Sequence, residues 1–221
     1  MDQPSHLVGD SRSVPAATKR LNRAQSRNQT RERLLSAART IFLKKGCAAA
    51  SVEDIAVEAG HTRGAFYSNF RSKTELFVEL LERDHDEAMA ELERIFTAGG
   101  TRDEVERKVL AYYRQRYRRH ETFLMWTEAK LQAARDVRFR TPFNAFMRKR
   151  QERTTACIRA FAERTRAPLR LPAEVLALGL MELCDGVQSR YAVDPQCVTN
   201  ALADAVLAGF FACTVFDRVP E

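Results

Sequence analysis

Residues 51–77 constrain the fold more than any other part of the chain, and they read SVEDIAVEAGHTRGAFYSNFRSKTELF. Ser51 and Asp54 have the spacing of a capping box, in which a hydroxyl and an acid satisfy free amides of a helix's first turn. Gly60 interrupts the apolar periodicity that follows, at a point where a left-handed or tight backbone is needed. Thr62 then offers an N-cap for a second helix, and residues 72–75 repeat the capping-box pattern. The pattern predicts two short helices joined by a glycine turn, followed at once by the start of a third.

The second helix of this stretch has the surface of a DNA reader. It is short, and the small, polar and cationic residues at its N-terminus suit insertion into a major groove. Arg63 can hold guanine through two hydrogen bonds, whereas Thr62 can offer a hydroxyl to a base or a methyl group to thymine. Gly64 permits close approach of the backbone. We therefore expect this helix to read base pairs, with Phe66 and Phe70 anchoring it.

Three further residues near this helix are candidates for contacts with the DNA backbone. Tyr67 is expected on a phosphate or sugar rather than on a base edge. Lys73 lies at the start of the third helix, where free amides and the positive end of the helix dipole would add to its charge at a phosphate. Ser51 can make a similar contact, although capping its own helix is an equally good use of its hydroxyl. His61 can reach DNA or simply cap the turn, and both roles stay open.

Positive charge is concentrated around this stretch. Residues 1–75 hold 13 basic and 7 acidic side chains, whereas the remainder of the chain holds 23 and 22. Charge alone would fit any solvated basic surface, but beside a helix-turn-helix pattern it favours binding to phosphates. Residues 1–27 are expected to form a disordered basic arm, which either contacts DNA or serves only as a solubilising tail.

The spacing of these residues resembles the TetR (tetracycline repressor-type) family of bacterial transcriptional regulators. The matching positions are Leu34–Ala38, Ile41, Phe42, Gly46, Ser51, Val52, Asp54–Ala56, Ala59, Gly60, Arg63–Tyr67, Phe70 and Ser72–Phe77. The resemblance implies an all-α protein, with a three-helix DNA-binding domain at residues 28–75 and a helical effector-binding and dimerisation domain at residues 76–221. The chain departs from the family at Ala50, His61, Ser68 and Asn69, and part of its operator preference is expected to lie there.

The rest of the chain shows helical periodicity, and no strand pattern interrupts it. Pro142 either opens a helix with Thr141 as its cap or kinks a helix that begins near Asp136. Asp194 and Pro195 have the pattern of a cap and a first helical position, and they are expected to start the last helix. The other expected helices cover residues 30–45, 101–120, 123–134 and 173–191, with a long one from residue 73 to Gly99.

The last two expected helices are unusually apolar for the end of a chain. Their large apolar residues are Val175, Leu176, Leu180, Leu183, Val187, Val198, Leu202, Val206, Phe210 and Phe216. Packing against the same helices of a second subunit would bury this surface, although a monomer core would do so as well. The family resemblance favours the dimer, because members of the family pair through their last two large helices. We expect a homodimer that reads a palindromic operator on double-stranded DNA.

A stripe of aromatic and sulfur-containing residues in the second half of the chain is more typical of plain core than of a binding site. The resemblance to regulators that bind small molecules between these helices makes the stripe a candidate effector cavity. Its expected lining is Phe123, Trp126, Phe143, Phe146, Met147, Met181, Cys184 and Gln188, with Glu128, Lys130 and Arg140 as further polar groups. A small-molecule effector would favour an arrangement in which the paired DNA-binding domains no longer match the operator. Repression is the usual mode of the family, and activation or ligand-independent binding is the alternative.

Other classes of protein find less support in the sequence. The four histidines lie in no nucleophile or zinc motif and no phosphate-binding glycine loop is present, so we expect neither an enzyme nor a cofactor. Residues 84–86 are expected to form an exposed acidic patch and not a metal site, because neighbouring residues on a helix point apart. The scattered cysteines and the lack of a membrane-spanning apolar run predict a cytoplasmic protein. An architectural DNA-binding protein with little sequence preference is the remaining alternative.

Overall fold

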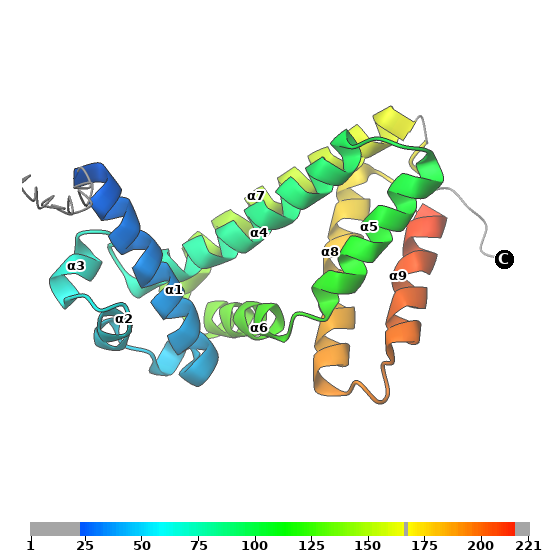
Figure 1. Cartoon of the computed structure of the whole chain (residues 1–221). Coiled ribbons are helices and arrows are strands. Elements are labelled where there is room, and N and C mark those ends of the chain that lie inside the picture. The colour runs from blue at the N-terminus through cyan, green and yellow to red at the C-terminus, as the bar shows by residue number, and fades with distance from the viewer. Residues whose placement is uncertain (1–22, 166–167, 215–221) are drawn as a thin grey trace, which may run out of the picture.

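The computed structural model describes residues 23–165 and 168–214, which form nine helices and no strand (Figure 1). The helices are α1 (Arg23–Ala49), α2 (Val52–Glu58), α3 (Arg63–Tyr67), α4 (Lys73–Thr97), α5 (Arg102–Tyr117), α6 (His120–Arg135), α7 (Val137–Thr165), α8 (Ala173–Val193) and α9 (Asn200–Thr214). The expected all-α fold is confirmed for this part of the chain.

The helices form two groups at opposite ends of the molecule (Figure 1). α1, α2 and α3 gather at one end, whereas α5, α8 and α9 pack together at the other. α4 and α7 run side by side from the first group to the second. α6 contacts α1 as well as α7 and α8. The two groups are therefore connected by three helices rather than by a flexible linker.

Local capping explains where the two short helices begin. Ser51 and Asp54 form a complete capping box at the start of α2. At the start of α3, Thr62 Oγ1 accepts a hydrogen bond from the Ala65 amide at 3.2 Å. Gly60 lies between the helices with a φ of 68°, a left-handed conformation that residues with side chains rarely adopt. The predicted helix-turn-helix pattern is therefore present, with the expected residue at each of its turning points.

The start of α4 follows the predicted pattern in part. Ser72 Oγ accepts a hydrogen bond from the Glu75 amide at 3.1 Å, as expected for the N-cap residue. The Glu75 carboxylate, however, accepts from the Arg71 amide at 2.7 Å and not from the amide of the cap residue itself. The helix then runs to Thr97, just before Gly99, close to the expected end.

α1 differs from the expected helix at both ends. It begins at Arg23, so residues 23–27 are helical and do not belong to a disordered arm. The rest of the expected arm, residues 1–22, lies outside the described residues. At the other end, Gly46 interrupts α1 with a φ of 78° and a ψ of 160°, and a last turn follows to Ala49. That backbone conformation is essentially restricted to glycine, which explains why the interruption falls at this position.

α7 continues through Pro142 from a start at Val137, so the alternative that begins this helix near Asp136 is the correct one. Asp136 acts as the cap, because its Oδ1 accepts a hydrogen bond from the Arg138 amide at 2.8 Å. Pro142 is the sixth residue of α7 and has no amide hydrogen, so the helix lacks one hydrogen bond of its regular backbone series at this point.

The expected start of the last helix at Asp194 is wrong. Asp194 Oδ1 accepts a hydrogen bond from the Cys197 amide at 2.9 Å and caps only a single turn. α9 begins at Asn200, where Thr199 Oγ1 accepts from the Leu202 amide at 3.2 Å. A second cap close behind the first therefore decides where the helix starts.

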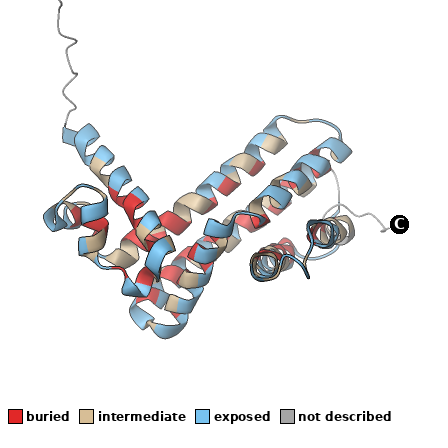
Figure 2. Cartoon of the chain, turned by 60° about the horizontal axis from the view of Figure 1, so that its bottom comes forward, coloured by how far each residue is buried: buried red, intermediate tan, exposed pale blue. Residues whose placement is uncertain are grey.

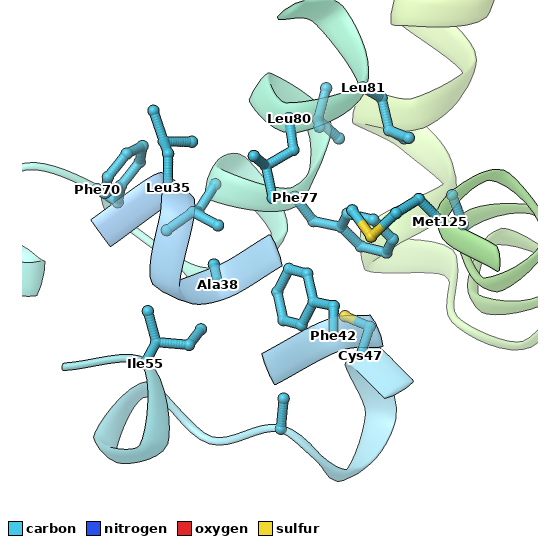
Figure 3. Packing of buried hydrophobic residues seen from close by; sticks show 14 of the residues in the cluster. Leu35, Ala38, Phe42, Cys47, Ile55, Phe70, Phe77, Leu80, Leu81 and Met125 are labelled. Carbon is cyan, nitrogen blue, oxygen red and sulfur yellow. The ribbon is translucent and has the colours of Figure 1, made fainter. Parts of the chain in front are cut away.

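One hydrophobic cluster joins the helix-turn-helix to the long helices (Figure 3). The rings of Phe42 on α1 and Phe77 on α4 have centroids 4.8 Å apart, and Phe139 on α7 follows at 5.5 Å from Phe77. Met125 brings α6 to the same cluster (Figure 3). The domain boundary predicted after residue 75 falls within α4, and a shared core crosses it.

A second cluster lies at the far end of the molecule, where α4 and α5 pack with α7, α8 and α9. Figure 2 shows the buried positions along the facing sides of the long helices and the exposed positions along their outer sides. This division is that of amphipathic helices, whose apolar stripe faces a core.

Candidate DNA-binding surface and effector cavity

α3 presents the residues that were expected to read DNA. Thr62, Arg63 and Gly64 are exposed, and Tyr67 keeps 49% of its surface accessible. Phe66 is fully buried and anchors the helix in the core. The predicted reading residues therefore share one short helix at one end of the molecule (Figure 1).

The intramolecular contacts of Arg63 are weak enough to be exchanged for a base. Its Nη1 lies 3.9 Å from Glu53 Oε2, and its guanidinium carbon lies 5.6 Å from the centre of the Tyr67 ring. Exposed ion pairs of this kind contribute little to stability in water. A Cβ at Gly64 would lie 3.7 Å from Thr62 Oγ1, which is ordinary contact, so the fold itself does not require glycine at this position.

Lys73 has a different environment from the one expected. Its ammonium group donates hydrogen bonds to the carbonyl oxygens of Cys47 and Ala50, the latter at 2.6 Å. These carbonyls belong to the end of α1 and the loop after it, where a cation satisfies groups left free by the helix. The hydroxyl of Ser51 is similarly engaged, because it donates to the Asp54 carboxylate and accepts from the Asp54 amide. Both side chains therefore have structural roles within the domain.

Two arginines of α1 hold the C-terminal end of the reading helix, a role that the sequence analysis missed. Ser68 and Asn69 donate side-chain hydrogen bonds to carbonyls one turn earlier, at 2.9 and 2.8 Å. Their own backbone carbonyls accept hydrogen bonds from Arg27 and Arg31. The one-turn spacing of these two cations on α1 is the signal that points to this role. Nearby His61 is half-buried, and its Nε2 has no hydrogen-bond partner among the described residues.

A cavity of about 50 Å³ lies among α4, α5, α6, α7 and α8. Half of the predicted lining residues border it, namely Trp126, Met181, Cys184 and Gln188. The other four, Phe123, Phe143, Phe146 and Met147, do not. Phe143 and Phe146 are buried in the cluster shared with the DNA-binding end, and Met147 packs against that cluster. Helical spacing identified a buried stripe, but it did not show which neighbouring helix each residue faces.

Several polar residues line this cavity that the sequence analysis did not select, namely His85, Tyr112, Arg116, Arg150 and Asp185. A signal for one of them is present in the sequence. Arg150 stands at helical spacing within the apolar stripe of α7, between Phe146 and Thr154. A cation at a core position is rare unless it is paired, which makes such a position a candidate site.

Ion pairs between helices surround the cavity. Asp84 Oδ2 accepts hydrogen bonds from Arg116 at 2.7 Å and from the Trp126 indole at 3.1 Å. On the opposite side, Asp185 pairs with Lys130 at 2.7 Å. Both carboxylates therefore have close cationic partners. Of the predicted polar groups, Gln188 also lines the cavity, where its amide donates to the backbone carbonyls of α5 and the following turn.

The expectation of an exposed acidic patch at residues 84–86 is wrong. His85 is only 4% exposed, because this side of α4 faces the cavity and not the solvent. Burial, together with the nearby cations Arg150, Arg153 and Arg116, lowers the pKa of His85 to about 4. The imidazole is therefore neutral at neutral pH. Burial likewise raises the pKa of the Cys184 thiol to about 12, so this cysteine is not a reactive thiolate.

Glu128 on α6 links the cavity side of the molecule to the end of α1. Its Oε1 accepts hydrogen bonds from the amides of Cys47 at 2.9 Å and Ala48 at 3.4 Å. Lys73 binds carbonyls of the same segment from the other side. The segment after Gly46 is thus held by one acid from α6 and one base from α4. Glu128 was expected to be a polar group of the cavity, but it does not line it.

The apolar residues of α8 and α9 divide between core and surface. Leu176, Leu180 and Val187 are buried within the chain. Exposed large apolar residues remain on both helices, at Val175, Leu178, Leu202 and Val206. Phe216, which was expected to contribute, lies beyond the part of the chain that the structure describes. Separately, none of the described helices combines the length and the apolar character needed to span a membrane.

Known proteins match this architecture. The model of the bacterial regulatory proteins of the tetR family matches residues 34–80. The uncharacterized HTH-type transcriptional regulator YerO of Bacillus subtilis is 32% identical over 100 residues, which cover 44% of this chain and 35% of that protein. The chain thus spans about a third of the length of this curated relative.

Two solved structures extend the likeness to the whole fold. A putative TetR-family regulator from Rhodococcus sp. superposes with a TM-score of 0.71 at 21% identity, over 85% of this chain and 99% of that one. SmeT in its complex with triclosan superposes with a TM-score of 0.63 at 26% identity, over 87% and 97%. With the helix-turn-helix and its caps, these likenesses assign residues 34–80 to the tetR family of bacterial regulatory proteins, and the chain as a whole has the fold of solved structures described as transcriptional regulators.

Proposed function

We propose that this protein is a sequence-specific DNA-binding transcriptional regulator, and in its simplest form a cytoplasmic repressor released from its operator by a small molecule. The observation that carries the proposal is the exposed set Thr62, Arg63, Gly64 and Tyr67 at the start and along the side of α3, in which Arg63 has only weak internal contacts. Residues 28–75 would bind DNA, and residues 76–221 would bind the effector and form the dimer. The likeness to the tetR family supports this division.

The exposed apolar residues of α8 and α9 support a homodimer. Leu178 and Val175 on α8 and Leu202 and Val206 on α9 are each more than a third exposed in the single chain. Exposed large apolar residues on two adjacent helices are typical of a contact between subunits. In a dimer, two α3 helices about 34–36 Å apart, or a multiple of that distance, would read a palindrome. Light scattering after size exclusion should give twice the chain mass, and a monomer at micromolar concentration would refute the dimer.

The size of the cavity supports a regulatory mechanism. A volume of about 50 Å³ holds a few water molecules but no drug-sized ligand. A larger effector must therefore favour a conformation in which the surrounding helices stand further apart. α4 and α6 line the cavity and also reach the DNA-binding end, α6 through the Glu128 contact. The similar structure of SmeT is a complex with triclosan, which supports small-molecule binding in this fold.

Selection of binding sites from random-sequence DNA tests the proposal. The wild-type protein should enrich an inverted repeat, and Arg63→Ala should enrich a more degenerate one, because the loss of a two-bond contact to guanine costs about 1–3 kcal/mol of discrimination. Arg94→Ala, which removes an exposed arginine from α4, is the matched control and should enrich the wild-type repeat. Equal binding to all sequences would favour the architectural alternative.

A transcription reporter separates the two modes of regulation. The enriched repeat is placed upstream of the reporter gene, with and without the protein. Lower expression in the presence of the protein supports a repressor, and higher expression supports the activating alternative.

A further inference from the structure

Two cavities of different character lie side by side in the helical domain. The first holds the polar residues described above, including His85 and Arg150. The second, of about 30 Å³, has an apolar surface lined by residues that include Phe96, Phe161 and Phe211, and only two of its lining residues carry a hydroxyl group. Both are bordered by the same five residues, Met89, Leu92, Tyr113, Thr154 and Leu180. These shared residues form the boundary between the two cavities, and if the side chains there moved aside, the cavities would join into one elongated site with a polar end and an apolar end.

The polar end has a buried cation that lacks a full set of partners. Arg150 is 8% exposed, and its Nη1 has no hydrogen-bond partner among the described residues. Its other contacts are the Trp126 ring, 4.4 Å away, and Asp185, whose Oδ1 lies 3.7 Å from Nη2. Asp185 is already paired more closely with Lys130. Because a buried N–H without an acceptor is unfavourable, a ligand that supplies an acceptor at Nη1 gains affinity.

The charge balance at this end favours an anionic ligand. The carboxylates of Asp84 and Asp185 each have a cation at 2.7 Å, which leaves Arg150 as a cation without a close carboxylate of its own. His85 adds a second buried nitrogen without a partner, Nε2, on the α4 side of the same cavity. A carboxylate has two oxygens, so it can accept from the guanidinium and, at the same time, from a neutral imidazole in the tautomer that carries its hydrogen on Nε2.

We propose that the effector site binds a small amphiphilic carboxylate, with its anionic group at Arg150 and His85 and its apolar part directed toward Phe96, Phe161 and Phe211. This inference rests on the proposed effector-binding function and adds the chemical class of the ligand. The flexible side chain of Met89 lies between the two ends, where it can move aside for a longer molecule.

A set of probes that differ only in their polar group tests the assignment. 3-Phenylpropanoate, 3-phenylpropanamide and 3-phenylpropylamine share one apolar part, and their dissociation constants for the full-length protein are measured by calorimetry. We expect the carboxylate to bind at least tenfold more tightly than the amide, and the amine to bind most weakly. Equal or tighter binding of the amide or the amine, or no binding of any of the three, would overturn the assignment.

Variants locate the contact. Arg150→Gln should weaken binding of 3-phenylpropanoate about tenfold or more and should leave binding of the amide nearly unchanged, since a charge-assisted hydrogen bond is stronger than a neutral one. Arg150→Lys keeps the charge and should restore part of the affinity, which guards against a folding defect in the first variant. Arg148→Gln, at an exposed position of α7, is the matched control. Unchanged affinity of Arg150→Gln for the carboxylate would exclude the proposed contact.

A mobility-shift titration with the enriched DNA repeat distinguishes the failure of this inference from a failure of the proposed function. Release of DNA by 3-phenylpropanoate supports both. Tight binding of the carboxylate without release of DNA supports the ligand class and refutes its action as an effector. DNA release by 3-phenylpropylamine alone supports effector regulation and refutes the ligand class.

Discussion

The helix-turn-helix and the effector cavity differ in how far along the chain their key contacts reach. In the helix-turn-helix, the caps join residues three apart, as in the pairs Ser51–Asp54 and Thr62–Ala65. Around the cavity, the ion pair between Asp84 and Arg116 joins residues 32 apart. The first kind of contact depends on local spacing, and the second depends on how whole helices pack. The DNA-binding end is thus defined by its turns, whereas the cavity is defined by charges held between helices.

Breaking the ion pair between Asp84 and Arg116 should have the largest effect on stability. Arg116→Met leaves a mostly buried carboxylate without its cation, and this should lower the free energy of unfolding by about 3–5 kcal/mol. The double variant with Asp84→Leu should recover part of the loss. Urea denaturation measures the effect. Arg94→Ala, which removes an exposed pair with Glu91, should cost less than about 1 kcal/mol and is the control.

His85 should make the stability of the cavity region depend on pH. Its pKa falls from an ordinary value of 6.5 to about 4 in the folded protein. Between these two pH values the unfolded chain binds more protons than the folded protein. The contribution of His85 to the free energy of unfolding is therefore fully present above about pH 6.5 and is lost as the pH drops toward 4. The loss is on the order of 3 kcal/mol.

Substitution by a residue that does not titrate tests this effect. His85→Leu should flatten the pH dependence of the urea midpoint in this range, whereas His120→Gln, which changes an exposed histidine, should retain the wild-type profile. A parallel slope in His85→Leu and the wild type would show that other groups cause the dependence.

Lys73 tests whether the DNA-binding end is stabilised by this side chain or uses it on DNA. Lys73→Met removes two hydrogen bonds from a cation to carbonyls of Cys47 and Ala50, which should cost about 2 kcal/mol in a thermal or urea melt. The salt dependence of DNA binding should stay as in the wild type. If the slope of the logarithm of the binding constant against the logarithm of the salt concentration were instead smaller by about 1, Lys73 would be identified as a phosphate contact. Exposed Lys44→Met is the control.

The smallest expected loss of stability comes from replacing either of two glycines with positive φ, Gly60 and Gly46, by alanine. Gly60→Ala introduces a side chain with no atom within 4 Å, so only backbone strain of about 1 kcal/mol is expected. Gly46→Ala places a Cβ 3.3 Å from Glu128 Oε1, and the backbone conformation at this position is more restrictive than at Gly60. This variant should therefore lose about 1 kcal/mol more stability than Gly60→Ala. Equal melting temperatures of the two variants would mean that the Glu128 contact adjusts freely.

Features of the helix-turn-helix that depend on local spacing could be predicted from the sequence, whereas contacts that depend on the packing of whole helices could not. Ser51, Gly60 and Thr62 determine the turns of the helix-turn-helix through their own backbone preferences, and all three occur where expected. Lys73 shows where this reasoning fails. A lysine at a helix N-terminus is positioned for a phosphate by its own helix, but the carbonyls at the end of α1 were brought to it by tertiary packing.

The cavity could be predicted only in part, for the same reason. Trp126 and Gln188 line it, whereas Phe143 and Phe146 stand on a part of α7 that faces the aromatic cluster. Which residue of a helical stripe faces which neighbour depends on the crossing of α4, α6 and α7, and periodicity in one segment contains no information about that crossing. The incomplete pairing of Arg150 depends on Lys130 having taken the nearer position at Asp185, a relation among three helices.

The narrowness of the cavity also sets a threshold for signalling. Metabolite-sized solutes are abundant in any cell, but a hole of about 50 Å³ admits water and ions without moving a helix. Under the proposed function such occupants would produce no output, because they would not favour the conformation with the helices further apart. Only a molecule that is too large for the resting cavity, and that binds Arg150 strongly enough to offset the opening, would change the state of the protein. The tight packing that stabilises the helical domain would therefore also make its response selective.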